Sequence, residues 1–298
     1  MRKNKLKYLD PAVLSRLNNM KLIARLVVEG FIIGRHKSPY HGFSVEFAEH
    51  RPYMPGDEIK HIDWKLYGKT DRFYVKQFEE ETNLKSYILL DKSGSMGFKS
   101  QKVSKLEYGS YLAASLGYLM LNQQDAAGLV LFDRKISRYI PPLAKMGHLN
   151  LILHELEKVT PGDETSISLI LHEMAEKIKK RGLVILISDL MDNVEDIIFG
   201  LKHFRYKKHE VIVFHILDPQ EVEFKYKNFT KFIDLESGES ISTEPWFIRN
   251  SYARKLQEII NYSRTQFRNN QIDYVLLTTD HTLDHALIEY LNKRRRLG

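Results

Sequence analysis

The stretch Ser86-Tyr87-Ile88-Leu89-Leu90-Asp91-Lys92-Ser93-Gly94-Ser95-Met96 indicates both the fold of the chain and the place of its most distinctive site. The apolar run that ends at Leu90 predicts a short buried strand. Because alternate residues of an extended segment point the same way, Asp91, Ser93 and Ser95 can direct three oxygen atoms to one point just beyond the strand. Hard oxygen ligands of this kind suit Mg²⁺, which usually keeps several waters as well. The stretch therefore predicts a strand that leads into a metal site.

Predicted strands and helices alternate from residue 86 to the end of the chain. The strands are expected at 86–91, 126–132, 136–140, 183–188, 210–217 and 273–278. Helical patterns are expected at 103–122, 145–158, 167–180, 194–205, 246–269 and from 282. This alternation predicts an α/β fold with a doubly wound, mainly parallel sheet. Residues 219–244 interrupt the alternation and predict an inserted hairpin around Ser237-Gly238-Glu239.

Residues 1–85 have a different pattern and predict a small N-terminal accessory module. A basic tail is followed at Asp10-Pro11 by the start of a helix, since Asp is a common N-cap and Pro a common first helical residue. Strands are expected near 43–50 and 73–82, paired as an antiparallel ribbon. We therefore expect two domains, 1–85 and 86–298.

The composition excludes several classes of protein. The chain has 298 residues, of which 43% are hydrophobic, and this supports a full core. It has no cysteine, so disulfides, thiolate metal ligands and a cysteine nucleophile are excluded. No apolar run approaches the roughly 18–20 residues of a membrane helix, and no apolar signal core follows the basic start. We expect a cytoplasmic protein without a transmembrane segment.

The chain is basic, with a net charge of +7. Most of the positive excess lies in residues 1–85, where it can attract nucleic acid, anionic lipid or an acidic protein. An ordinary solvated surface is the simpler explanation. The repeated aromatic and basic spacing of single-strand binders is not present, so we expect no specific nucleic-acid partner. A basic-surface binder of nucleic acid or lipid stays open as an alternative function.

Two later segments of the sequence add candidate metal ligands to Asp91, Ser93 and Ser95. In an open α/β sheet, ligands bind beyond the carboxyl ends of the strands, and Asp189 follows the predicted strand at 183–188. Thr165 lies in the turn Pro161-Gly162-Asp163-Glu164-Thr165-Ser166, ahead of a predicted helix. The predicted metal ligands are therefore Asp91, Ser93, Ser95, Thr165 and Asp189. Each has a structural alternative: hydrogen bonds within a strand-end turn for the first three, a helix cap for Thr165, and a cap or salt bridge for Asp189.

These five residues, in this order, resemble the metal-ion-dependent adhesion site of von Willebrand factor A domains. The segment ahead of them narrows the resemblance: Glu46-Phe47, Arg51-x-Tyr53-x-x-Gly56-Asp57-x-Ile59-x-x-Ile62-Asp63-Trp64 and Glu79-x-Glu81. This block is similar to a bacterial domain-of-unknown-function family whose members accompany MoxR-type AAA+ ATPases. Lys60 stands where that family usually has Arg, and Lys65-Leu66-Tyr67-Gly68 replaces a typical Ala-Arg stretch. The resemblance covers most of the chain and implies a von Willebrand factor A-like α/β domain.

The resemblance also implies a protein-binding adaptor rather than an enzyme. In such sites Mg²⁺, or Mn²⁺ or Ca²⁺ in its place, accepts one more carboxylate from an Asp or Glu of a partner protein. We therefore expect two partners, a MoxR-type AAA+ ATPase and a client protein that supplies the carboxylate, in complex assembly or a stress response. The Gly56-Asp57…Asp63-Trp64 block either anchors the accessory module or forms a partner surface.

A metal-dependent hydrolase that uses the same strand-end site is the alternative function. It needs a positioned base or nucleophile. The candidate bases, chosen only by proximity in sequence, are His61, His148, His154 and His172.

Overall fold

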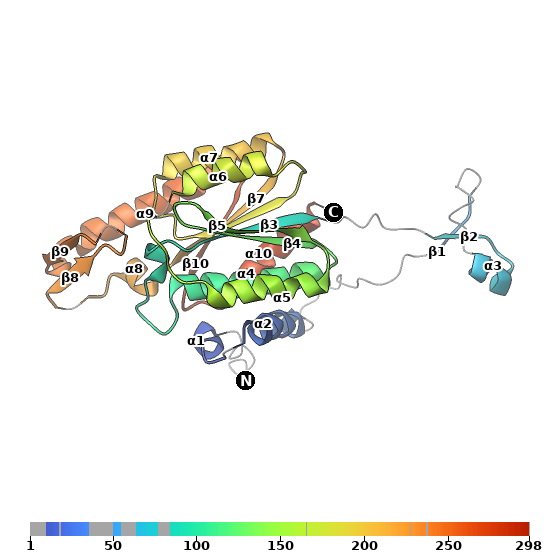
Figure 1. Cartoon of the computed structure of the whole chain (residues 1–298), viewed down its shortest axis with the longest axis horizontal. Helices are drawn as coiled ribbons and strands as arrows, with labels where there is room; N and C mark the ends of the chain where they lie inside the picture. Colours follow the sequence, from blue (N-terminus) through green and yellow to red (C-terminus); the bar gives the residue numbers. More distant parts are fainter. Residues whose placement is uncertain are drawn as a thin grey trace. The chain divides into compact units, whose positions relative to one another are not determined.

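The computed structural model describes residues 10–17, 19–35, 50–54, 64–76, 84–164, 166–226, 228–236 and 238–297. They fall into two compact units (Figure 1). One unit lies within Met1–Ser38 and Leu84–Gly298, and the other within Pro39–Asn83.

A six-stranded sheet forms the centre of the larger unit, in the order β10-β7-β6-β3-β4-β5. Its strands are β3 (Lys85–Asp91), β4 (Ala126–Phe132), β5 (Ile136–Leu143), β6 (Leu183–Ser188), β7 (Glu210–Leu217) and β10 (Asp273–Thr278). β3, β4, β6, β7 and β10 run parallel, whereas β5 pairs antiparallel with β4 at the edge. The predicted fold class, α/β with a doubly wound and mainly parallel sheet, is confirmed.

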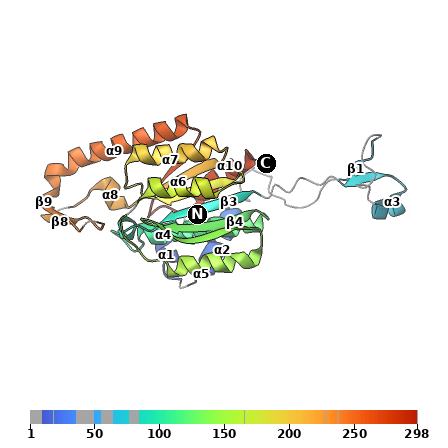
Figure 2. The ribbon, with the colours of Figure 1, turned by 45° about the horizontal axis from the view of Figure 1, so that its top comes forward.

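Helices cover both faces of this sheet (Figures 1 and 2). One face carries α6 (Ile167–Lys177), α7 (Val194–Tyr206) and α9 (Pro245–Asn269), and the other carries α4 (Lys105–Asn122), α5 (Met146–Lys158) and α10 (Asp284–Arg295). Side chains of β3 alternate between the two hydrophobic clusters, Leu89 in one and Ile88 and Leu90 in the other. This explains why the central strands are continuous apolar runs, since both of their faces are buried.

The first two helices, α1 (Pro11–Leu14) and α2 (Met20–Arg35), belong to the larger unit. Ile23, Val27 and Phe31 lie in the same hydrophobic cluster as the inner face of α4. The backbone N–H of Met20 donates to Glu157 on α5 at 3.0 Å. The structure therefore divides the chain differently from the predicted boundary at residue 85, because the apolar face of α2 is buried against the helices of the α/β unit.

The smaller unit contains β1 (His50–Pro52), α3 (Trp64–Thr70) and β2 (Tyr74–Lys76). β1 and β2 pair antiparallel, as predicted for this part of the chain. The rings of Tyr67 and Phe73 stack with centroids 4.4 Å apart, and Trp64 meets both edge-on. Trp64 therefore contributes to the aromatic packing of this unit, while Gly56, Asp57 and Asp63 lie outside the described residues.

The predicted insertion is present between β7 and α9. It consists of a short helix, α8 (Pro219–Glu223), and an antiparallel hairpin of β8 (Thr230–Ile233) and β9 (Ser240–Thr243). Across the described ranges, no helix has the length and apolar character needed to cross a membrane.

Candidate metal centre

The candidate site lies at the carboxyl ends of β3 and β6, which are neighbours in the sheet. Leu90 is in register with Ile187, so Asp91 and Ser188 follow side by side. The hydroxyl of Ser188 donates to Oδ2 of Asp91 at 2.7 Å, and both residues are fully buried. The parallel pairing thus brings together residues that are far apart in the sequence.

The loop after β3 curls its oxygen atoms towards one another. The backbone N–H of Ser93 donates to Oδ1 of Asp91 at 2.9 Å, and Oγ of Ser93 lies 3.1 Å from Oγ of Ser95. Neighbouring ligands of an octahedral Mg²⁺ ion, at about 2.1 Å from the metal, lie roughly 3 Å apart. The two hydroxyls therefore have the spacing of adjacent ligands, which fits the predicted site.

The electrostatics of Asp91 also favour a cation. Burial and the nearby charge of Asp189 together raise the pKa of Asp91 to about 7, although hydrogen bonds from Ser188 and Ser93 act to lower it. A buried carboxylate beside another carboxylate is costly to ionise. A positive ion placed at these oxygens would stabilise the ionised form.

Asp189 lies close enough to Asp91 to affect its pKa, and its carboxylate forms an ion pair with Lys105. Its Oδ2 accepts a hydrogen bond from the ammonium group of Lys105 at 2.7 Å. The same ammonium group lies 2.6 Å from Oε1 of Glu221 on α8, and Lys105 is only 1% exposed. Although burial opposes the charged form, the charges of Asp189 and Glu221 raise the pKa of Lys105. Part of the negative charge of Asp189 is therefore neutralised within the chain.

Thr165 lies outside the described residues, so its role as a ligand stays a prediction. The turn that contains it runs along the loop after β3. The N–H of Gly162 donates to the carbonyl of Lys92 at 2.6 Å, and the N–H of Gly94 donates to the carbonyl of Asp163 at 3.0 Å. These bonds hold the turn beside the predicted ligands.

The inserted hairpin also contacts the loop after β3, and the sequence did not predict this contact. The backbone N–H of Ser95 donates to Oε1 of Glu236 at 3.4 Å. The carbonyl of Leu235 approaches Gly94 so closely that a Cβ at Gly94 would lie 2.8 Å from it. The sequence held one indication of this contact, because an insertion between β7 and α9 starts at the same edge of the sheet as the site.

The donor set consists of oxygens from two carboxylates and at least two hydroxyls. Within the described part of the chain, no group of three or more His, Asp or Glu side chains is placed to hold a metal. The hydroxyls of Ser93 and Ser95 are the further oxygens that the Asp-x-Ser-x-Ser spacing predicts as ligands. The residues present fit Mg²⁺ bound with several waters.

Two of the histidines proposed as bases, His148 and His172, contact other groups. Nε2 of His148 lies 3.1 Å from the Pro141 carbonyl, and Nδ1 of His172 lies 3.3 Å from Nδ1 of His203. His154 is exposed on α5, and His61 lies outside the described residues. His215 is buried close to Asp189, but its Nδ1 lies 2.7 Å from the hydroxyl of Tyr274, and burial lowers its pKa to about 4. None of these observations supplies a base for hydrolysis.

The parallel strands and the antiparallel edge strand define the class of the larger unit as an α/β domain with a doubly wound, mainly parallel sheet. The Asp-x-Ser-x-Ser sequence begins at the end of β3. Residues 49–259 match the family described as "Protein of unknown function DUF58". The chain belongs to this DUF58 family.

Several known proteins are similar to this chain. Uncharacterized proteins Rv1480 of Mycobacterium tuberculosis and Mb1516 of Mycobacterium bovis are each 22% identical over 295 residues, which cover 96% of this chain and 91% of theirs. The crystal structure of the conserved hypothetical protein BatB from Bacteroides thetaiotaomicron is 16% identical, with a TM-score of 0.48 and coverage of 71% of this chain and 98% of BatB. The SpRpn10 VWA domain is 11% identical, with a TM-score of 0.37 and coverage of 69% and 93%. Similarities at this level say nothing about what the protein binds.

Proposed function

We propose that this protein is a non-enzymatic adaptor that binds a partner protein through Mg²⁺ at the carboxyl ends of β3 and β6. The observation that carries the proposal is the buried carboxylate of Asp91 next to two hydroxyls, of Ser93 and Ser95, whose oxygens are 3.1 Å apart. This arrangement offers oxygen ligands at ligand spacing, and His148 and His172, the described candidate bases with partners, contact groups elsewhere. Such a set favours binding over catalysis.

Asp91, Ser93 and Ser95 would hold the ion, and Thr165 would complete the set. Asp189 would act through a bound water, because Lys105 already occupies its Oδ2. The ion would supply a positive charge at which a carboxylate of the partner binds. Mn²⁺ or Ca²⁺ would serve as alternatives, since both accept oxygen ligands.

The partners follow from the resemblance of the N-terminal block. We propose a MoxR-type AAA+ ATPase as one partner and a client protein with an exposed Asp or Glu as the other. The complex would act in the cytoplasm, in complex assembly or a stress response. Membership of the DUF58 family is compatible with this role and does not by itself assign it.

Capture of the client protein tests the proposal. The full chain is immobilised and incubated with a lysate of the same organism, in Mg²⁺ or in EDTA, and the captured proteins are compared. We expect Asp91→Asn and EDTA each to reduce capture at least about tenfold, because a neutral side chain and an empty site both remove the ionic contact. Asp280→Asn, which alters an exposed carboxylate just after β10, is the control and should bind as the unchanged chain does.

A second measurement separates metal binding from partner binding. Mg²⁺ at 100 times its dissociation constant should stabilise the unchanged chain by about 2.7 kcal/mol in chemical unfolding. Asp91→Asn should lose most of this increment. Equal capture in Mg²⁺ and EDTA, or an unchanged increment in Asp91→Asn, would contradict the proposal.

A further inference from the structure

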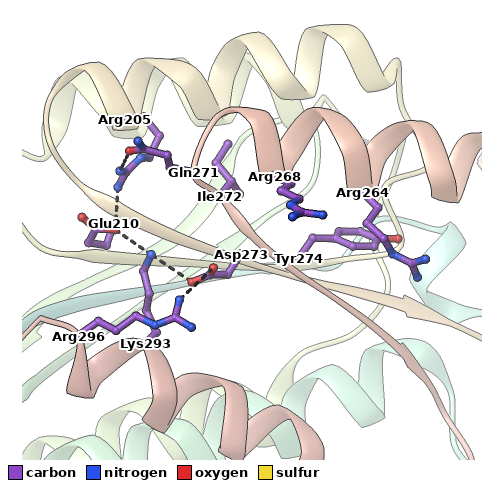
Figure 3. A pocket seen from close by; sticks show the side chains of 10 residues that line it. All are labelled: Arg205, Glu210, Arg264, Arg268, Gln271, Ile272, Asp273, Tyr274, Lys293 and Arg296. Atoms are coloured by element: carbon purple, nitrogen blue, oxygen red, sulfur yellow. Dashed lines mark hydrogen bonds and ion pairs between the residues drawn. The ribbon is translucent and has the colours of Figure 1, made fainter.

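A second candidate site lies at the other end of the sheet, at the amino ends of β7 and β10. A cavity of about 460 Å³ opens there (Figure 3). Glu210 is the first residue of β7 and Asp273 the first of β10, and both line the cavity. This volume lies within the range of small-molecule sites. The cavity is separate from the metal centre, because that centre lies at the carboxyl ends of β3 and β6, at the opposite edge of the same sheet.

The lining of this cavity is strongly basic. Five cationic side chains line it, and they come from α7, α9 and the C-terminal end of α10: Arg205, Arg264, Arg268, Lys293 and Arg296. Glu210 and Asp273 are the only acidic residues in the lining. The excess of cations means that an anion is the complementary ligand.

The two carboxylates are already bound by the cations closest to them. Glu210 accepts from Nη1 of Arg205 at 2.7 Å and from Nζ of Lys293 at 2.8 Å. Asp273 lies 3.1 Å from Nζ of Lys293. Lys293 is buried, so these bonds fix the floor of the cavity and leave its acidic groups neutralised.

The remaining positive charge is concentrated on α9. Arg264 and Arg268 are exposed and lie four residues apart, on the same side of the helix. Figure 3 shows both guanidinium groups next to Tyr274, whose ring lines the cavity. Among the residues that the structure describes, neither guanidinium has an ion pair, and neither donates a side-chain hydrogen bond. Two adjacent arginines are therefore available to a ligand.

We propose that this cavity binds a small ligand with two or more linked phosphate groups. Guanidinium groups present planar pairs of donors that match phosphate oxygens. Side chains four residues apart on a helix are roughly 6 Å apart at their base, so their flexible ends can engage neighbouring phosphates of one chain. The limited volume of about 460 Å³ suits a compact ligand better than an extended acidic peptide.

Calorimetric titration with pyrophosphate and with tripolyphosphate tests the inference. The full chain is used in EDTA at low salt, so that the metal centre takes no part. We expect saturable binding of one ligand per chain, with tripolyphosphate tighter than pyrophosphate. The double variant Arg264→Gln/Arg268→Gln should bind at least about tenfold more weakly, because it loses two charge-assisted contacts.

The chain offers a matched control on the same helix. Arg254 is exposed on α9 and does not line the cavity, so Arg254→Gln should bind as the unchanged chain does. The single variant Arg264→Gln should be intermediate, and thermal unfolding midpoints should agree among the variants. Absence of saturable binding at millimolar ligand, equal weakening in Arg254→Gln, or tighter binding of a hexaglutamate peptide would each overturn the inference.

Discussion

The ammonium group of Lys105 lies 2.7 Å from Oδ2 of Asp189, and both side chains are almost completely buried. Glu221 shares the same ammonium group, and Asp91 is close enough to Asp189 for its pKa to rise in response. Two carboxylates, those of Asp189 and Glu221, therefore contact one ammonium group at the edge of the sheet, and the carboxylate of Asp91 lies near Asp189. When all three carboxylates are ionised the cluster has two negative charges in excess, which matches the charge of one divalent cation.

The first prediction concerns Lys105 as the internal cation of this cluster. Lys105→Met should lower the free energy of unfolding by about 3–5 kcal/mol in EDTA, because it leaves buried carboxylates without a partner. Asp189→Asn in the same chain should recover part of this loss. Urea unfolding of the four chains of this double-mutant cycle gives the coupling energy.

Lys99→Met is the control, since Lys99 is exposed six residues before Lys105, and it should change stability by less than about 0.5 kcal/mol. Mg²⁺ should stabilise Lys105→Met more than the unchanged chain, because the metal then compensates a larger negative charge. A coupling energy near zero between Lys105 and Asp189 would contradict the assigned role.

The second prediction concerns the inserted hairpin. Glu236 brings a carboxylate to the backbone of Ser95, so Glu236→Gln should weaken Mg²⁺ binding roughly twofold to tenfold by removing a negative charge near the ion. Stabilisation against heat as a function of Mg²⁺ concentration measures the change. Glu239→Gln, at an exposed position in the same hairpin, is the control. An equal effect of both substitutions would show that only the overall charge matters.

The strands of the sheet could be predicted from the sequence alone, because each central strand is a short apolar run with clear ends. β3, β4 and β6 are buried along almost their whole length, so their composition alone separates them from the amphipathic helices. The positions of Asp91 and Asp189 followed from the rule that parallel strands end at one edge. These are local signals combined with one general rule.

Local sequence signals do not predict the burial of Lys105 or its ion pairs. A lysine at the start of a helix is normally exposed, and its partners Asp189 and Glu221 are 84 and 116 residues away in the sequence. Long-range contacts also explain why the boundary predicted at residue 85 differs from the division seen in the structure. The pattern of α2 indicates a helix with one apolar face, but it does not indicate which surface covers that face.

The third prediction tests the place of α2 in the larger unit. Ile23 is 2% exposed and its neighbour Leu22 is 43% exposed. Ile23→Ala should therefore lower the free energy of unfolding by about 2–5 kcal/mol, and Leu22→Ala should change it by less than about 0.5 kcal/mol. Urea unfolding of the full chain measures both. Similar small losses would mean that α2 contributes little to the core.

The last prediction concerns the dependence of stability on pH through His209, which is far from the metal centre in the sheet. His209 is 1% exposed, its Nδ1 accepts from the N–H of Gly182 at 3.2 Å, and its ring meets Phe204 edge-on. Burial lowers the pKa of His209, and the positive charges of Lys207 and Arg181 lower it further. The folded chain therefore favours the neutral ring, which can accept the bond from Gly182.

The direction in which stability changes with pH follows from the difference in proton binding by His209 between the folded and the unfolded chain. A histidine whose pKa is lower in the folded chain contributes its full stability above the unfolded pKa of about 6.5, and this contribution is lost as the pH falls below that value. His209 should therefore contribute a loss of stability between pH 7.5 and pH 5.0, measured in urea unfolding with EDTA as the difference between the unchanged chain and His209→Gln, because the raised pKa of Asp91 acts in the opposite direction in both chains. His209→Gln should be less stable at pH 7.5 but should lose less over the same interval. His154→Gln, at an exposed position, should keep the slope of the unchanged chain, and an unchanged slope in His209→Gln would assign the pH dependence to other groups.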